Sequence, residues 1–221
     1  MGNGTLVNIS NCMSSPTTYD VIVIGAGAAG LTASVGCAKV GKSVLLIEKD
    51  AMGGECTNAG CIPSKALLHH AKTLHAANQV AGSTKRTTQY RDEAFAYVSR
   101  VVEQLRKEET PETFTSQGIH VVKGEATFTG RCSLQVGETN YRFKRAIIAT
   151  GSAPRTIDIP GLAAERLLTN QNLFTLTDIP QELLIVGGGP IGLEMAQAFA
   201  MLGSQVTIVE RGAELARLED P

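Results

Sequence analysis

The sequence contains no tryptophan, few other aromatic residues and few cysteines, and it carries almost no net charge. Of its 221 residues 5% are aromatic and five are cysteine, and 20 Lys and Arg residues stand against 21 Asp and Glu residues. The charge balance argues against nucleic acid as a partner, because phosphate binding needs a clustered excess of Lys and Arg. Five cysteines are too few for a disulfide-rich secreted scaffold, and their odd number argues against complete pairing.

Long hydrophobic runs are also missing. The longest uncharged run, residues 21–38, has 18 residues, and four glycines, one threonine and one serine interrupt it. A buried strand, a turn and a helix explain it better than a membrane span. The first 20 residues contain no Lys or Arg, unlike a signal peptide. We therefore expect a soluble, cytoplasmic protein with no membrane partner, in which residues 1–18 form a disordered tail.

Glycine is abundant, with 23 residues, and some of it belongs to an internal repeat. Each copy predicts a buried strand, a glycine-rich turn, a helix and a second strand that ends at an acidic residue. The first copy has strands at 21–24 and 43–47, a helix to about residue 40, and the residues Gly25, Gly27, Gly30 and Glu48. The second copy has strands at 183–186 and 205–209, a helix at 193–202, and the residues Gly187, Gly189, Gly192 and Glu210. Gly25 and Gly187 are 162 residues apart, as are Glu48 and Glu210, so the copies superpose without a gap.

Each copy carries the pattern GxGxxG with an acidic residue 18 positions after the last glycine, which is the dinucleotide-binding fingerprint. The three glycines permit a tight turn, a close approach of backbone N–H groups to a pyrophosphate, and close packing of helix on strand. The acidic residue accepts hydrogen bonds from ribose hydroxyls. Two fingerprints predict two nucleotides, FAD and a nicotinamide cofactor. Glu210 disfavours a ribose 2′-phosphate and so favours NAD, whereas Arg211 beside it leaves NADP open.

Two cysteines, Cys56 and Cys61, lie close together in the segment GGECTNAGCIPSKALL, residues 53–68. Pro63 fits the first turn of a helix, so the cysteines are expected at a helix entrance. There the helix dipole and Lys65 would lower the pKa of a thiol, which predicts reactive cysteines. In a regular helix the two residues would be too far apart for a disulfide, so the segment is predicted to bend at Asn58 and Gly60.

Zinc binding is the competing interpretation, because three histidines follow at His69, His70 and His75. The cysteine spacing is not the short one of zinc sites, and no second cysteine pair completes a tetrahedron. We therefore expect no metal site, and we place the histidines on a helix surface or partly buried. The other cysteines, Cys12, Cys37 and Cys132, are expected to be bystanders.

The segment GGECTNAGCIPSKALL resembles the redox-active segment of the class I pyridine nucleotide–disulfide oxidoreductases, a family that includes dihydrolipoyl dehydrogenase, glutathione reductase and mercuric reductase. With the two fingerprints and residues 149–152, the resemblance covers about residues 19–221. It implies an α/β fold with a Rossmann-type FAD-binding domain at 19–160, which carries a β-meander insertion. A crossover at 161–182 then leads to the first βαβ unit of a second, truncated Rossmann-type NAD(P)-binding domain at 183–221. Family members are roughly twice as long, so we expect an N-terminal fragment, with the dimer interface and the catalytic His–Glu pair outside it.

The resemblance also implies residue roles. Cys56 would exchange with substrate and Cys61 would hold its thiolate against the flavin. Lys65 would lie near flavin N5 and Glu48 on the adenosine ribose. Further residues expected along the FAD site are Lys49, Gly54, Ala126, Thr150, Gly151 and Ser152. Electrons would pass between NAD(P)H, FAD, a Cys56–Cys61 disulfide and a small-molecule or lipoyl-type disulfide, in a homodimer.

Several features leave the substrate open. Glu55 stands where the family most often has threonine, and its charge would raise the pKa of Cys56. Residues 168–174 and 189–199 resemble the mercuric-reductase-like branch, whereas Glu210 favours an NAD-using dehydrogenase. We expect dihydrolipoyl dehydrogenase-like activity. The alternatives are a mercuric reductase-like enzyme and a catalytically incomplete nucleotide-binding fragment.

Two more segments have clear patterns. Residues 91–109 place Phe95, Val98, Val101, Val102 and Leu105 at helical spacing, which predicts an amphipathic helix that faces the core. Residues 118–148 alternate short strands with glycines, and we assign all of them to the antiparallel meander.

Overall fold

Two sheets, one in each copy of the internal repeat, organise the computed structural model, which describes residues 18–82 and 85–217. The larger sheet has six strands in the order β3-β2-β1-β6-β5-β4. Its strands are β1 (Thr18–Ile24), β2 (Val44–Glu48), β3 (Ile119–Lys123), β4 (Ala126–Gly130), β5 (Ser133–Val136) and β6 (Thr139–Ile148). The first three strands and β6 run parallel, and β4, β5 and β6 form an antiparallel meander. In the smaller sheet β7 (Glu182–Val186) and β8 (Gln205–Val209) are parallel.

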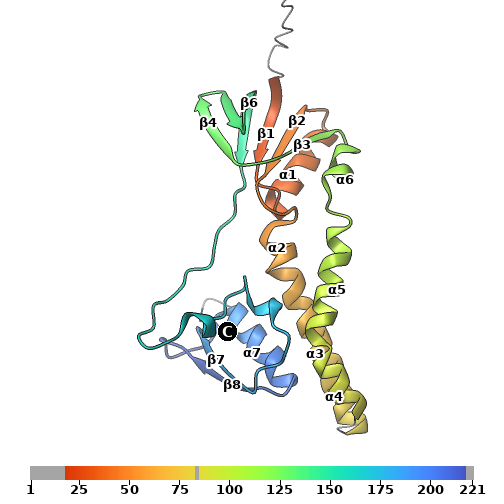
Figure 1. Ribbon diagram of the computed structural model, residues 1–221, viewed down its shortest axis with the longest axis vertical. Helices are drawn as coiled ribbons and strands as arrows, with labels where there is room; N and C mark the ends of the chain where they lie inside the picture. The colour runs from red at the N-terminus through yellow and green to blue at the C-terminus, as the bar shows by residue number, and fades with distance from the viewer. Residues whose placement is uncertain (1–17, 83–84, 218–221) are drawn as a thin grey trace, which may run out of the picture.

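Helices connect these strands (Figure 1). They are α1 (Ala28–Lys39), α2 (Gly54–Asn58), α3 (Cys61–Ala81), α4 (Lys85–Asp92), α5 (Ala94–Arg106), α6 (Pro111–Thr115) and α7 (Pro190–Met201), with short 3₁₀ turns η1 (Ala164–Arg166) and η2 (Leu173–Thr175). Figure 1 shows α3 and α5 side by side, running from the six-stranded sheet at the top towards the smaller unit below. The long segment between β6 and β7 descends separately to that unit.

The mixed α/β architecture confirms the predicted fold class, and several details differ. Residues 119–123 do not belong to the meander, because β3 pairs in parallel with β2. The chain between these two strands is helical, and a helical crossover returns a strand in the parallel direction. α7 begins at Pro190, three residues before the predicted start, and α4 and α6 were not predicted. Apart from Thr18, which opens β1, the predicted tail lies outside the described residues, as does Cys12.

Two of the parallel strands of the large sheet, β1 and β2, are buried on both faces. Val21 and Val23 of β1 pack with Leu31 of α1 and Phe114 of α6. The alternate residue Ile22 packs on the other face with Leu45 and with side chains of β5 and β6. Ile22 and Leu45 are both fully buried. This double burial explains why β1 and β2 are continuous apolar runs rather than alternating ones.

The second sheet is far more exposed, although its sequence repeats the first. Leu184 is 61% exposed and Val186 is 51% exposed, whereas Ile22, the counterpart of Leu184, is 0% exposed. β1 is flanked by β2 and β6, but β7 has β8 as its one strand neighbour among the described residues. Corresponding residues of β1 and β7 therefore differ in exposure, because β1 has a second strand neighbour and β7 has none among the described residues.

A third apolar core joins the two units. Leu67 and Leu74 of α3, Phe95 and Val98 of α5, and Phe199 of α7 are all buried in it. The predicted helix at 91–109 is confirmed at Ala94–Arg106, and Phe95, Val98 and Val102 are its buried positions. The amphipathic face of α5 therefore helps to hold the second unit against α3.

His70 also lies in this region, and it differs from the expectation of a surface or partly buried residue. Its side chain is 1% exposed and its ring stacks on Tyr90, with 3.8 Å between ring centroids. Its Nε2 hydrogen bonds the Tyr90 carbonyl oxygen at 2.6 Å. Burial lowers the pKa of His70, so the ring is a neutral structural group.

Within residues 18–82 and 85–217, no helix is long and apolar enough to cross a membrane.

Two glycines of α1 provide a matched test of the packing. An alanine Cβ at Gly30 would lie 1.8 Å from the Gly25 carbonyl oxygen, whereas at Gly36 none of the described atoms lies within 4 Å. We expect Gly30→Ala to lower the free energy of unfolding by about 2 kcal/mol or more, since α1 must move away from β1. Gly36→Ala should raise it by roughly 0.5–1 kcal/mol, because alanine favours a helix interior. Urea unfolding of both variants measures this, and equal effects would contradict the packing account.

Candidate functional site

The first glycine-rich turn brings β1 and α1 into close contact. Gly25 has φ +100°, a conformation that favours glycine, and its N–H donates to the Ile47 carbonyl oxygen at 2.8 Å. Gly27 caps α1 without a side-chain hydrogen bond from the described residues. The N–H groups in the first turn of α1 thus lack a side-chain cap, which is the arrangement that binds phosphate at a helix N-terminus.

Glu48 is held against this turn by backbone groups. Its carboxylate accepts from the Ala26 N–H at 2.6 Å and from the Asp50 N–H at 2.8 Å. The carboxylate that ends β2 is therefore fixed at the carboxyl end of the parallel sheet, where ligands of such sheets bind. Its remaining lone pairs suit ribose hydroxyls, as the fingerprint predicts.

The second turn reproduces this arrangement bond for bond. Gly187 has φ +110°, and a Cβ at Gly192 would lie 2.3 Å from the Gly187 carbonyl oxygen. Glu210 accepts from the Gly188 N–H at 2.7 Å and from the Gly212 N–H at 2.8 Å. These hydrogen bonds lower the pKa of the Glu210 carboxyl group. The offset of 162 residues thus holds for the hydrogen bonds as well as for the sequence.

A cavity of about 420 Å³ opens beside the first turn. Of the residues predicted for the FAD site, Gly30 and Lys65 do not line this cavity and all the others do. The lining residues are Gly25, Gly27, Glu48, Lys49, Gly54, Ala126, Thr150, Gly151 and Ser152. Gly54 reaches the cavity because a Cβ there would lie 2.7 Å from the Gly27 Cα, so the chain after β2 touches the turn itself. The tertiary structure therefore joins five separate parts of the sequence around one cavity, near residues 24–27, 47–59, 124–126, 149–152 and 171.

The second predicted site is less complete. Gly187, Gly189 and Gly192 line a larger cavity of about 1150 Å³, between the β6–β7 connection and the exposed face of β7. Glu210 does not line this cavity, unlike Glu48 in the first unit. In this unit the three glycines line the cavity beside the turn, and the acidic residue lies outside that cavity.

The cysteine segment bends as predicted. Cys56 lies in α2, Cys61 begins α3, and the two helices are separated by Ala59 and Gly60. Asn58 secures the break, because its Nδ2 donates to the Met52 and Gly54 carbonyl oxygens at 2.9 and 2.8 Å. Neither cysteine is in a disulfide with any described residue, and the Cys61 side chain lies close enough to Cys56 to raise the pKa of its thiol. The bend therefore brings the two thiols together.

The pKa of the Cys56 thiol is raised, so the lowering expected from the helix entrance and Lys65 is wrong, whereas the direction expected from Glu55 is right but has other causes. The largest cause is the hydrogen bond with the Cys61 side chain, followed by burial and by the charge of Cys61, with a smaller contribution from Glu109. The Cys61 backbone N–H acts in the opposite direction. The acidic residue that contributes is thus Glu109, in the turn between α5 and α6, rather than the adjacent Glu55. Nothing in the sequence pattern indicates Glu109.

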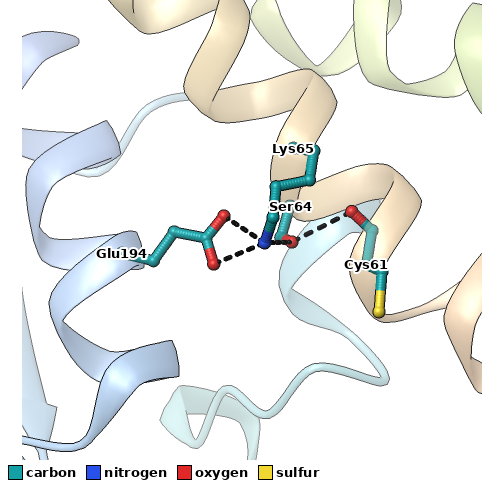
Figure 2. Close-up of polar contacts among 4 residues, drawn as sticks. All are labelled: Cys61, Ser64, Lys65 and Glu194. Carbon is teal, nitrogen blue, oxygen red and sulfur yellow. Dashed lines mark hydrogen bonds and ion pairs between the residues drawn. The ribbon is translucent and has the colours of Figure 1, made fainter. Parts of the chain in front are cut away.

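Lys65 does not provide the positive charge expected beside the thiols. Its Nζ donates to both carboxylate oxygens of Glu194, on α7, at 2.7 and 2.8 Å. Figure 2 shows that Ser64 contacts the carbonyl oxygen of Cys61, at 3.2 Å, rather than its sulfur. The ammonium group is therefore paired across the two units, and its field at the cysteines is largely cancelled.

The zinc site of the competing interpretation is not present in the described part of the chain. No group of three or more His, Cys, Asp or Glu side chains there could hold a metal ion. His75 instead hydrogen bonds Gln79, one helical turn further along α3, at 2.9 Å.

The Cys61–Cys56 hydrogen bond predicts a shift in thiol reactivity. In Cys61→Ala the largest cause of the raised pKa disappears, so the pKa of Cys56 should fall towards its ordinary value. Under reducing conditions at pH 7.5, alkylation of Cys56 by iodoacetamide should become about two- to fivefold faster, since more thiolate is present. Peptide mass spectrometry across a pH series measures this, with Cys132→Ala as the control. A Cys56 profile that stays unchanged, or moves to higher pH, would contradict it.

Comparisons with known proteins agree with this geometry. The family model described as "Pyridine nucleotide-disulphide oxidoreductase" matches residues 19–221. A mercuric reductase of Streptomyces lividans is 37% identical over 220 residues, and a dihydrolipoyl dehydrogenase of Staphylococcus aureus is 37% identical over 215 residues. These alignments cover 95% and 90% of this chain but 46% and 44% of the relatives.

Solved structures give the same result. The HOCl-induced flavoprotein disulfide reductase RclA from Escherichia coli matches with a TM-score of 0.77 and 33% identity, over 92% of this chain and 44% of that one. A Cu(II) complex of the same protein matches with a TM-score of 0.75. The chain spans somewhat less than half the length of these relatives. With its two fingerprint turns and its paired cysteines, it belongs to the pyridine nucleotide-disulphide oxidoreductase family.

Proposed function

We propose that the chain is the electron-relay part of an FAD-dependent oxidoreductase that passes electrons between NAD(P)H and a disulfide substrate. One observation carries the proposal: the bend after Asn58 brings together Cys56 of α2 and Cys61 at the start of α3, beside the nucleotide cavity that Glu55, Asn58 and Ala59 line. A fixed dithiol beside a dinucleotide site is suited to two-electron exchange.

The residues around the smaller cavity fit an adenine dinucleotide. Uncapped N–H groups of α1 face a phosphate position, Glu48 suits a ribose, and glycines leave room for close backbone approach. Bound there, FAD would supply hydride and electron transfer between nicotinamide and sulfur. In the second unit Gly187, Gly189, Gly192 and Glu210 would bind NAD(P), with NAD favoured by Glu210 and NADP left open by Arg211.

The cysteines complete the exchange. Two electrons and two protons convert a Cys56–Cys61 disulfide into two thiols, and loss of one proton from Cys56 gives the thiolate. A Cys56 thiolate then attacks one sulfur of the substrate disulfide and expels the other as a thiol, forming a mixed disulfide. Cys61 attacks that bond next, which releases the second substrate thiol and restores the Cys56–Cys61 disulfide. For dihydrolipoyl-type substrates the same steps run in reverse.

The rest of the proposal follows the family resemblance. It divides the chain into an FAD-binding domain at 19–160, a crossover at 161–182 and the start of an NAD(P)-binding domain at 183–221. It also includes a homodimer, a cytoplasmic location and a lipoyl-type or small-molecule disulfide substrate.

Mercuric ion is the second candidate substrate. A mercuric reductase is as similar to this chain as a dihydrolipoyl dehydrogenase is, at 37% identity each. Two partly accessible thiols in contact are also suited to a soft metal ion. Comparing turnover of lipoamide and of mercuric ion by the full-length protein separates the two candidates.

Reconstitution with FAD tests the flavin part of the proposal. The chain should bind FAD and turn yellow, and reduction should produce the long-wavelength absorption band that a thiolate beside oxidised flavin gives. Cys61→Ser should remove this band, whereas Cys56→Ser and the remote Cys132→Ser should retain it. A visible spectrum after titration with dithionite measures it.

A colourless preparation that FAD cannot reconstitute would contradict the flavoprotein proposal and leave a nucleotide-binding fragment. A band that survives Cys61→Ser but is lost in Cys56→Ser would reverse the assigned cysteine roles.

A further inference from the structure

The connection between β6 and β7 touches the redox segment through one side chain. Asn170 donates from Nδ2 to Oε1 of Glu55, although the residues lie 115 positions apart. Glu55 adjoins Cys56 on α2, and it also lines the nucleotide cavity. This contact therefore ties the connection to the helix of the exchanging thiol at the edge of that cavity.

The local backbone holds Asn170 in place. The Thr169 N–H donates to the Asn172 Oδ1 at 2.7 Å, and the Asn172 Nδ2 donates to the Leu167 carbonyl oxygen at 3.0 Å. The next residue, Gln171, lines the same cavity as Glu55. The turn at 169–172 thus closes one side of the nucleotide cavity and presents Asn170 to α2.

The cavity that Glu55 lines has more acidic than basic side chains around it. Its lining includes the acidic residues Glu48, Asp50, Glu55 and Glu125, against Lys49 as the one basic residue. Backbone N–H groups already fix Glu48. Glu55 is exposed, and Asn170 is its one side-chain hydrogen-bond partner among the described residues. A freely rotating carboxylate at this position would repel a pyrophosphate.

We propose that Asn170 is a positioning residue for nucleotide binding, which holds the Glu55 carboxylate against the β6–β7 connection and away from the phosphates. The inference rests on the proposed FAD site and adds to it a residue of the connecting segment. It also accounts for how the cavity tolerates an acidic residue where the family most often has threonine.

A double-mutant cycle on FAD affinity tests the inference. In low salt, Asn170→Ala should raise the Kd for FAD about three- to tenfold, because the released carboxylate can turn into the cavity in which the phosphates would bind. In Glu55→Gln/Asn170→Ala the Kd should return to within about twofold of Glu55→Gln alone, since no charge remains to be held. The loss in Asn170→Ala should shrink in 1 M KCl. ADP, which carries the pyrophosphate without the flavin, should show the same order of affinities.

Each outcome decides a different point. Asn140→Ala and Glu138→Gln, exposed residues of the β5–β6 hairpin, should bind FAD as the unaltered chain does. Equal affinity in the unaltered chain and Asn170→Ala, or a loss that Glu55→Gln does not rescue, overturns the positioning role and leaves the FAD site intact. If the unaltered chain binds neither FAD nor ADP, the proposed function fails, and this inference fails with it.

Discussion

The close packing of each helix against its preceding strand is the constraint on which the structure depends. A Cβ at Gly30 or Gly192 would lie 1.8 or 2.3 Å from the carbonyl oxygen of the first glycine of its turn. That packing leaves the first helical N–H groups uncapped by side chains and directed at the carboxyl end of the sheet. Glu48 and Glu210 then bind the turn backbone, so each fingerprint is a single hydrogen-bonded unit.

The two units use the same local structure in different surroundings. In the first unit, the residue that follows β6 lies against the glycine-rich turn, since a Cβ at Gly25 would be 2.3 Å from the Ala149 carbonyl oxygen. At Gly187 the same position is open in the described part of the chain. Residues after β6 therefore supply one wall of the first cavity, together with Glu48, whereas Glu210 does not line the cavity beside the second turn.

The cysteine segment, residues 53–68, lies where the two units meet. α3, which begins at Cys61, packs with α5 and α7 in one apolar core. Two polar contacts reinforce this arrangement, between Lys65 and Glu194 and between Glu55 and Asn170. Both join the cysteine helices to residues more than a hundred positions later in the chain. Movement of the second unit relative to the first would therefore displace the helices that carry the cysteines.

The sequence by itself determined the fold class, the two fingerprint turns and the bend between the cysteines. These follow from local rules: apolar runs for buried strands, glycine for a close approach, and a five-residue spacing that a regular helix cannot bridge. Contacts between distant residues were decided by the tertiary structure alone. It paired Lys65 with Glu194 and turned Glu55 to Asn170. It also placed the Cys61 side chain, and to a smaller extent Glu109, where they raise the pKa of the Cys56 thiol. The charge that a thiol experiences depends on which groups lie around it in space, and neighbours in the sequence do not specify those groups.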